Sequence, residues 1–166
     1  MSDDRPAVVG VGNILMGDDG VGPQVIELLR MRGIGERAEL LDAGLAFGEV
    51  LCDIAPERTL VIVDATRGGD ASGTIYRLDP SDVDAQAGAL GGRSGLSLHE
   101  VNVLPTLQTE ALAGRAFKDV TIFGIEPEVV DWSEALSPAV ADAAEKLVDL
   151  IVAFLDERAR KVATKE

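Results

Sequence analysis

The sequence predicts a single three-layer α/β domain, residues 1–166, with a mostly parallel, twisted sheet of about five strands and helices on both faces. Short apolar runs rich in β-branched residues alternate along the chain with longer amphipathic segments, and this alternation is typical of such folds. The length of 166 residues suits one domain with a sizeable core. Neither an internal repeat nor a linker divides the chain.

Five short apolar runs are expected to be the strands, at residues 7–12, 38–41, 59–63, 74–78 and 120–124. Three amphipathic segments are expected to be helices, at residues 21–32, 47–54 and 100–112. Residues 79–97 show no clear period and are expected to form a mobile loop.

A long C-terminal helix is predicted to begin with Ser137 as N-cap and Pro138 as the first helical residue. Its apolar residues recur at helical spacing. They are Val140, Ala144, Leu147, Val148, Ile151, Phe154 and Leu155. The charged residues 158–166 are expected to fray.

The composition excludes several classes of partner. Acidic residues number 29 against 15 basic ones, and the net charge of -14 argues against nucleic acid and against anionic membrane surfaces. That charge suits a cationic partner or a metal ion. The sequence shows no signal peptide and no apolar run long enough to span a bilayer, so a cytoplasmic location is expected. A monomer is expected as well.

The single cysteine, Cys52, cannot form an intramolecular disulfide and fits a reducing compartment. Its apolar neighbours predict a small buried hydrophobic residue rather than a nucleophile. Trp132 and Tyr76 are isolated aromatic residues and are expected to serve packing.

Residues 10–22, with the sequence GVGNILMGDDGVG, form the most informative stretch of the chain. Five glycines in thirteen positions require a sharp turn or a close approach of the backbone to another group. Asn13 is expected to brace this turn through its side chain. The adjacent carboxylates of Asp18 and Asp19 are the part that suggests chemistry.

These carboxylates are predicted to meet a third. In open α/β sheets, ligands bind beyond the carboxyl ends of the strands where the winding direction reverses. With a strand order of 2-1-3, that point lies between the first and third strands, which Asp18 and Asp19 and then Asp64 follow. A turn-capping role is the alternative for each aspartate taken alone.

His99 is the only histidine, so any imidazole chemistry must use it. It follows the expected loop and could fold over the crevice, although a surface position is the alternative. Two carboxylates and one imidazole form a mixed donor set that suits nickel, zinc or iron, and ligand type alone does not choose among them. Three protein ligands would leave coordination positions open.

A dinucleotide site is a competing interpretation. Gly10-x-Gly12 follows a strand, and Asp42 stands where a ribose-binding acid would be expected. Leu15 occupies the third glycine position, however, and the two aspartates would repel a pyrophosphate.

The motifs together resemble those of the hydrogenase maturation endopeptidases. They are the 10–22 stretch, Val63-Asp64-Ala65, Ser97-Leu98-His99, the segment 123–127 and Leu136-Ser137-Pro138. The resemblance runs in register from about residue 7 to 155. It implies a twisted sheet covered on both faces and cleavage of a C-terminal extension from the large-subunit precursor of nickel–iron hydrogenase.

The resemblance also implies roles for individual residues. Asp19, Asp64 and His99 match the residues that recognise nickel, whereas Asp18 matches an acidic neighbour that is not a ligand. Asp42 is retained, but Leu45 stands where the family pattern has a threonine. Nickel would arrive in the precursor, and either the metal or an aspartate would activate the attacking water. A non-catalytic nickel chaperone and a nucleotide-binding module are the alternatives.

Overall fold

The structure is a computed structural model and describes residues 3–80, 97–98 and 103–164. The strands are β1 (Ala7–Val11), β2 (Glu39–Gly44), β3 (Thr59–Arg67), β4 (Ile75–Leu78), β5 (Ser97–Leu98) and β6 (Asp119–Ile125). The α-helices are α1 (Val21–Met31), α2 (Phe47–Cys52), α4 (Val103–Leu112) and α5 (Pro138–Ala163). Two 3-10 helices, η1 (Gly17–Gly20) and η2 (Ile34–Glu36), flank α1.

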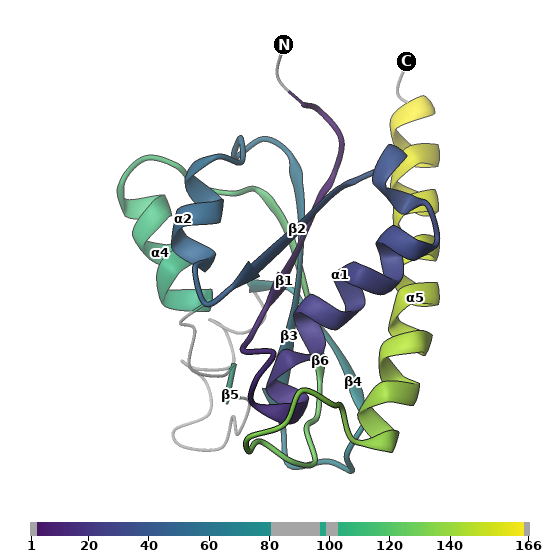
Figure 1. Ribbon diagram of the computed structural model, residues 1–166. Helices are drawn as coiled ribbons and strands as arrows, with labels where there is room; N and C mark the ends of the chain where they lie inside the picture. Colours follow the sequence, from purple (N-terminus) through teal and green to yellow (C-terminus); the bar gives the residue numbers. More distant parts are fainter. Residues whose placement is uncertain (1–2, 81–96, 99–102, 165–166) are drawn as a thin grey trace.

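The strand order is β2-β1-β3-β6-β4 (Figure 1). The first four strands are parallel, and β4 pairs antiparallel with β6 at one edge. The short β5 pairs antiparallel with the end of β3. The predicted winding order is therefore confirmed, and the reversal point lies between β1 and β3.

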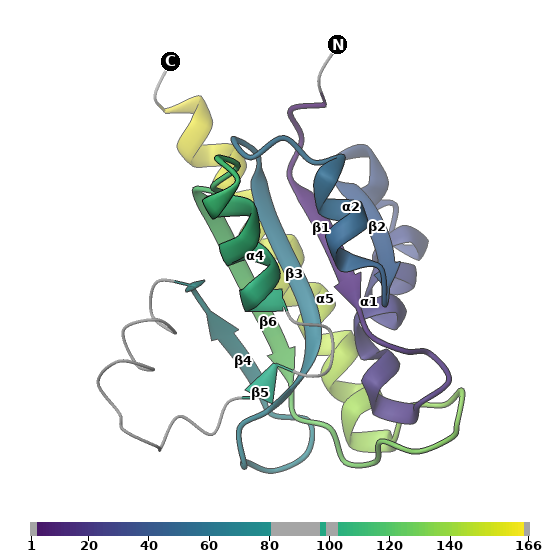
Figure 2. The ribbon, with the colours of Figure 1, turned by 90° about the vertical axis from the view of Figure 1, so that its left-hand side faces the viewer.

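Helices cover both faces of the sheet, with α2 and α4 on one face and α1 and α5 on the other (Figure 2). Alternation along β3 divides its side chains between two cores. Val61 and Val63 pack on the α1 and α5 side, and Leu60 and Ile62 pack on the α2 and α4 side. The fold class predicted from the sequence is confirmed.

The helix predictions hold with one extension. Ser137 is the N-cap residue of α5, and the predicted apolar residues of that helix are all buried. The helix continues through Ala163 where fraying was expected, and the Arg158 guanidinium contacts the Asp119 carboxylate at 2.7 Å. Pro105 lies in the first turn of α4, where a missing N–H breaks no helical hydrogen bond.

The third strand is longer than predicted. We expected it to end at Val63, but β3 continues to Arg67, so Asp64 lies within the strand. Pairing explains the extension, because Asp64 and Ala65 pair with β6 and Thr66 pairs with Leu98 of β5. The expected loop at 79–97 and the start of the expected helix at 100 fall mostly outside the described residues. No described helix is long and apolar enough to cross a membrane.

Candidate active site

The glycines after β1 allow the backbone to pack against itself. Gly12 has a φ of +133°, and a Cβ there would lie 1.9 Å from the Asp19 carbonyl oxygen. A Cβ on Gly20 would lie 2.8 Å from the Ile14 Cα. Asn13 braces the turn as predicted, since its Oδ1 accepts a hydrogen bond from the Leu15 amide at 3.0 Å. Gly12 and Gly20 therefore allow close packing of the loop on its own backbone, which accounts for these glycines without a bound phosphate.

Asp18 is fully buried and holds the loop before α5. Its carboxylate accepts hydrogen bonds from the amides of Glu128, Val129 and Ser137 and from the Ser137 hydroxyl, at 2.7–2.8 Å. Burial raises the pKa of Asp18, but these hydrogen bonds outweigh burial and hold the pKa below its ordinary value. Asp18 is thus a structural residue with its hydrogen-bonding capacity already used.

Asp19 and Asp64 form the chemically unusual pair. Both side chains are buried, at 4% and 1% exposure, and the helix η1 that carries Asp19 packs against β3. Asp19 Oδ2 accepts a hydrogen bond from the Asn13 amide at 2.9 Å, whereas Asp64 Oδ2 has no hydrogen-bond partner among the residues that the structure describes. Burial and the negative charge of Asp19 raise the pKa of Asp64 to about 8, against the opposing effect of the Ala65 amide.

A second buried oxygen beside this pair also lacks a partner. Within residues 3–80, 97–98 and 103–164, no group pairs with Thr66 Oγ1. Thr66 shares a sheet face with Asp64 because the two residues are two positions apart on β3. The Thr66 side chain lies over Gly124, where a Cβ would come within 2.1 Å of Oγ1. The sequence prediction missed Thr66. Extending the period-2 alternation of β3 past Val63 would have found it.

Glu126 lies within the 123–127 motif, but the sequence prediction gave it no role of its own. Its buried carboxylate accepts hydrogen bonds from the Gly68 amide at 2.5 Å and from the Tyr76 hydroxyl at 2.8 Å. Tyr76 also contacts Asp70 Oδ2 at 3.0 Å. These contacts tie the turn after β3 to β4 and β6.

His99 lies outside the described residues, so the structure does not place it. Leu98, the residue before it, pairs with Thr66, two positions beyond Asp64 on β3. Across residues 3–80, 97–98 and 103–164, no group of three Asp, Glu, His or Cys residues is arranged to hold a metal ion.

Three other expectations from the sequence can be compared with the structure. Cys52 is exposed on α2 and its thiol contacts the Gly48 carbonyl, so the prediction of a buried hydrophobic residue is wrong. Trp132 is 78% exposed, so a packing role is wrong for it. Asp42 Oδ1 accepts a hydrogen bond from the Gly44 amide at 3.0 Å, which supports the turn after β2.

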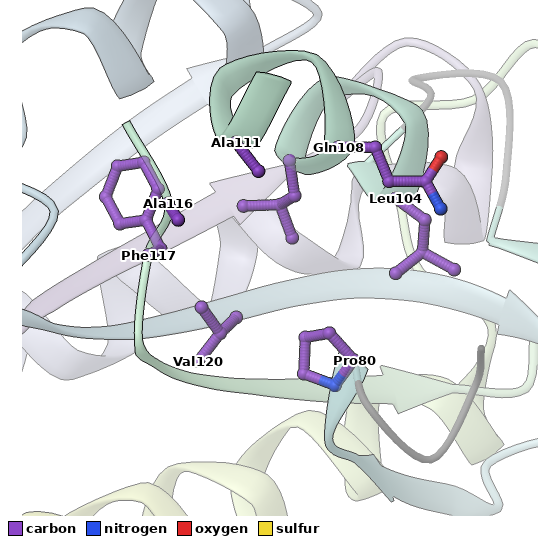
Figure 3. A pocket seen from close by; sticks show the side chains of 8 residues that line it. Pro80, Leu104, Gln108, Ala111, Ala116, Phe117 and Val120 are labelled. Carbon is purple, nitrogen blue, oxygen red and sulfur yellow. The ribbon is translucent and has the colours of Figure 1, made fainter. Parts of the chain in front are cut away.

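Two of the hollows in the structure bear on the candidate site. A cavity of about 210 Å³ between α4 and β6 is lined mainly by apolar side chains and contains none of the candidate residues (Figure 3). A pocket of about 410 Å³ lies beside the glycine loop. Its lining includes Ile14, Asp42 and Glu134. The first cavity offers no titratable group for catalysis.

The pair Asp19 and Asp64 can bind a cation or a proton. Two buried acidic groups without a counter-charge cost free energy, and a cation or proton between them relieves that cost. A buried carboxylate with a raised pKa can also act as a general base or acid near neutral pH.

Comparisons with known proteins identify the family of the chain. The family model HycI, hydrogenase maturation protease, matches residues 23–154. The hydrogenase 2 maturation protease of Escherichia coli K12 is 30% identical over 164 residues, 98% of this chain and 97% of that protein.

Solved structures share the fold. The hydrogenase maturating endopeptidase HybD from E. coli superimposes with a TM-score of 0.74 at 28% identity, over 93% of each chain. The [NiFe] hydrogenase maturation protease HybD from Thermococcus kodakarensis gives a TM-score of 0.75 over 91% of this chain and 99% of its own. At 21% identity, that second likeness concerns the fold alone. The chain therefore belongs to the hydrogenase maturation proteases, a family of endopeptidases.

Proposed function

We propose that this protein removes the C-terminal extension of a nickel-loaded nickel–iron hydrogenase large-subunit precursor. In this proposal Asp19, Asp64 and His99 contact the nickel, which arrives in the substrate. Metal recognition then serves as a check that the precursor is loaded before the peptide bond is cut.

The observation that carries the proposal is the buried pair Asp19 and Asp64, which no cationic side chain among the described residues neutralises. Asp64 has a buried oxygen without a partner in that part of the chain, next to a second buried carboxylate, at the reversal point of the sheet. Such a pair is stabilised by a cation that supplies the missing charge. A metal ion presented by the substrate fits this requirement.

His99 would supply the nitrogen donor. The pairing of Leu98 with Thr66 brings the chain close to Asp64 just before His99, which supports the assignment. Two carboxylates and an imidazole suit nickel among other borderline metals, and the remaining coordination positions would be filled by the precursor. Asp18 is excluded as a ligand because its carboxylate is already hydrogen bonded to the loop before α5.

Hydrolysis requires a water molecule to lose a proton as it attacks the scissile carbonyl carbon. The nickel could acidify that water, or a carboxylate of the pair could accept its proton. The raised pKa of Asp64 suits the second role, since a base with a pKa near the working pH both binds and releases protons.

The test uses purified precursor prepared with and without nickel. We expect the wild-type protein to shorten only the nickel-loaded precursor, as seen by intact mass spectrometry. Asp19→Asn, Asp64→Asn and His99→Ala should each abolish shortening while leaving the circular dichroism spectrum unchanged.

Three outcomes would count against the proposal. A full-length nickel-loaded precursor after incubation with wild-type protein excludes the peptidase, and nickel transfer without cleavage would favour a chaperone. Equal cleavage of nickel-free precursor excludes metal recognition. Wild-type processing by His99→Ala excludes the three-residue assignment.

A further inference from the structure

Large apolar side chains are exposed together on the loops around the candidate site. Nine large hydrophobic residues are exposed among those the structure describes. Five of them lie on the loops that follow β1, β2 and β6, and the other four are spread over α1, α4 and α5. We call the five the apolar rim. They are Ile14, Leu15, Leu45, Val129 and Trp132.

Backbone hydrogen bonds join these loops into one surface. The Ser133 amide donates to the Leu15 carbonyl at 3.0 Å, and the Gly17 amide donates to the Ser133 carbonyl at 2.8 Å. On the other side, the Gly12 amide donates to the Gly44 carbonyl at 2.9 Å. The loop after β1 and the loop before α5 lie side by side at the carboxyl end of the sheet (Figures 1 and 2). The five side chains therefore project from loops that are joined to one another at one end of the sheet.

The rim is continuous with the candidate site. The Asp18 amide donates to the Val129 carbonyl at 2.9 Å, and the Asp18 carboxylate accepts hydrogen bonds from the amides of Glu128, Val129 and Ser137. Asp19 is the next residue.

Acidic residues border the rim. Between Lys118 and Lys146 the chain has no basic residue, and Glu128, Asp131 and Glu134 are exposed in the loop that carries Trp132. The pocket beside Ile14 adds Asp42, Glu27 and Glu134, with Arg30 as its one basic residue. The complementary surface is an apolar patch flanked by lysine or arginine side chains.

We propose that the apolar rim is the docking surface for the large-subunit precursor and that Trp132 is its anchor, an inference that rests on the proposed function. The precursor would present an apolar pocket for Trp132, bordered by basic side chains. Tryptophan is enriched among the residues that dominate interface affinity. Large apolar side chains exposed on neighbouring loops beside a site are also a mark of an interaction surface.

The test compares Trp132→Ala with Leu112→Ala. Leu112 is 91% exposed at the end of α4 and serves as a matched control for loss of an exposed apolar side chain. We expect Trp132→Ala to weaken binding of nickel-loaded precursor by about 30-fold, the effect typical of a central aromatic contact. The KM for processing should rise in parallel with kcat nearly unchanged, and Leu112→Ala should match the wild type in both.

Direct binding, measured by biolayer interferometry, separates this inference from the proposed function. If the wild-type protein binds the precursor but does not cut it, the proposed function fails. The docking surface is then decided by binding alone: weaker binding of Trp132→Ala than of Leu112→Ala supports it, and equal binding overturns it. If wild-type protein binds and cuts, and Trp132→Ala does both equally well, the docking surface is wrong. An equal loss in Leu112→Ala would also overturn it. Thermal melts of both variants should match the wild type, because both side chains are exposed.

Discussion

Asp18 and Asp19 are adjacent in the sequence, yet the fold gives them opposite surroundings. Asp18 accepts four hydrogen bonds from the loop before α5 and from Ser137. Asp19 accepts one from Asn13, and its negative charge helps to raise the pKa of the neighbouring Asp64. The same residue type therefore stabilises the fold at one position and leaves unsatisfied charge at the next.

We expect Asp18→Asn to lower the free energy of unfolding by roughly 2–3 kcal/mol. A neutral amide loses the charge-assisted hydrogen bonds, and its NH₂ group would face backbone amides that also donate. Urea denaturation measures the change. Asp142→Asn, an exposed substitution on α5, should stay within about 0.5 kcal/mol of the wild type. Equal stabilities for the two variants would show that Asp18 does not hold the loop.

Asp64 should make the stability of the metal-free protein depend on pH. The unfolded chain releases this proton near the ordinary pKa of 3.8, whereas the folded protein holds it to about 8. The folded state therefore binds more protons in this interval, and Asp64 lowers the free energy of unfolding as the pH rises through it.

The variant Asp64→Asn removes that contribution. We expect its advantage in unfolding free energy over the wild type to be larger at about pH 8 than at about pH 5. Urea denaturation of both proteins at the two pH values provides the measurement, with chelator present. Parallel pH dependence in the two proteins would mean that burial does not raise the Asp64 pKa.

The helix α1 approaches the sheet closely because glycine stands at its contact points. A Cβ on Gly22 would lie 2.3 Å from the Val11 carbonyl oxygen and 2.5 Å from that of Val63. A Cβ on Gly10 would meet Gly22 and Ile26 in the same way. The absence of side chains at Gly10 and Gly22 lets α1 pack closely against β1 and β3. Because the loop that carries Asp19 leads directly into α1, the packing of this helix sets the position of Asp19.

Helix propensity and packing predict opposite signs for Gly22→Ala. Propensity alone would stabilise the helix by about 1 kcal/mol, but the clash with two backbone carbonyls should cost roughly 3 kcal/mol or more. We therefore expect net destabilisation in thermal and urea unfolding. Gly35→Ala is the control, because a Cβ there meets nothing within 4 Å. A stabilised Gly22→Ala protein would show that α1 can move away from the sheet.

At the level of the whole molecule, the net charge of -14 creates a negative field around the protein. We expect association with a precursor that presents basic residues to slow by about tenfold as NaCl rises from about 0.05 to about 0.5 M. Stopped-flow mixing measures the rate. The triple variant Glu128→Gln, Asp131→Asn, Glu134→Gln should show a weaker salt dependence. A rate independent of salt in the wild type would exclude electrostatic steering.

The order of residues was enough to predict the layers, the 2-1-3 part of the strand order and most helix positions. Those features depend on the local repeat of apolar residues and on caps such as Ser137 and Pro138. It also predicted that Asp18, Asp19 and Asp64 lie near one another, because parallel strands bring their carboxyl ends to one edge. The family resemblance then favoured Asp19 over Asp18. The assignment of His99 stays a prediction.

The contacts of each polar group near that edge became visible in the folded protein alone. Asp18 is satisfied by a loop some 110 residues away, while Asp64 Oδ2 and Thr66 Oγ1 have no partners in the described part of the chain. The tertiary structure also showed that Trp132 is exposed and that β3 extends past Asp64. Hydrogen-bond partners, burial and strand pairing come from segments distant in the chain, so no local pattern of residues could specify them.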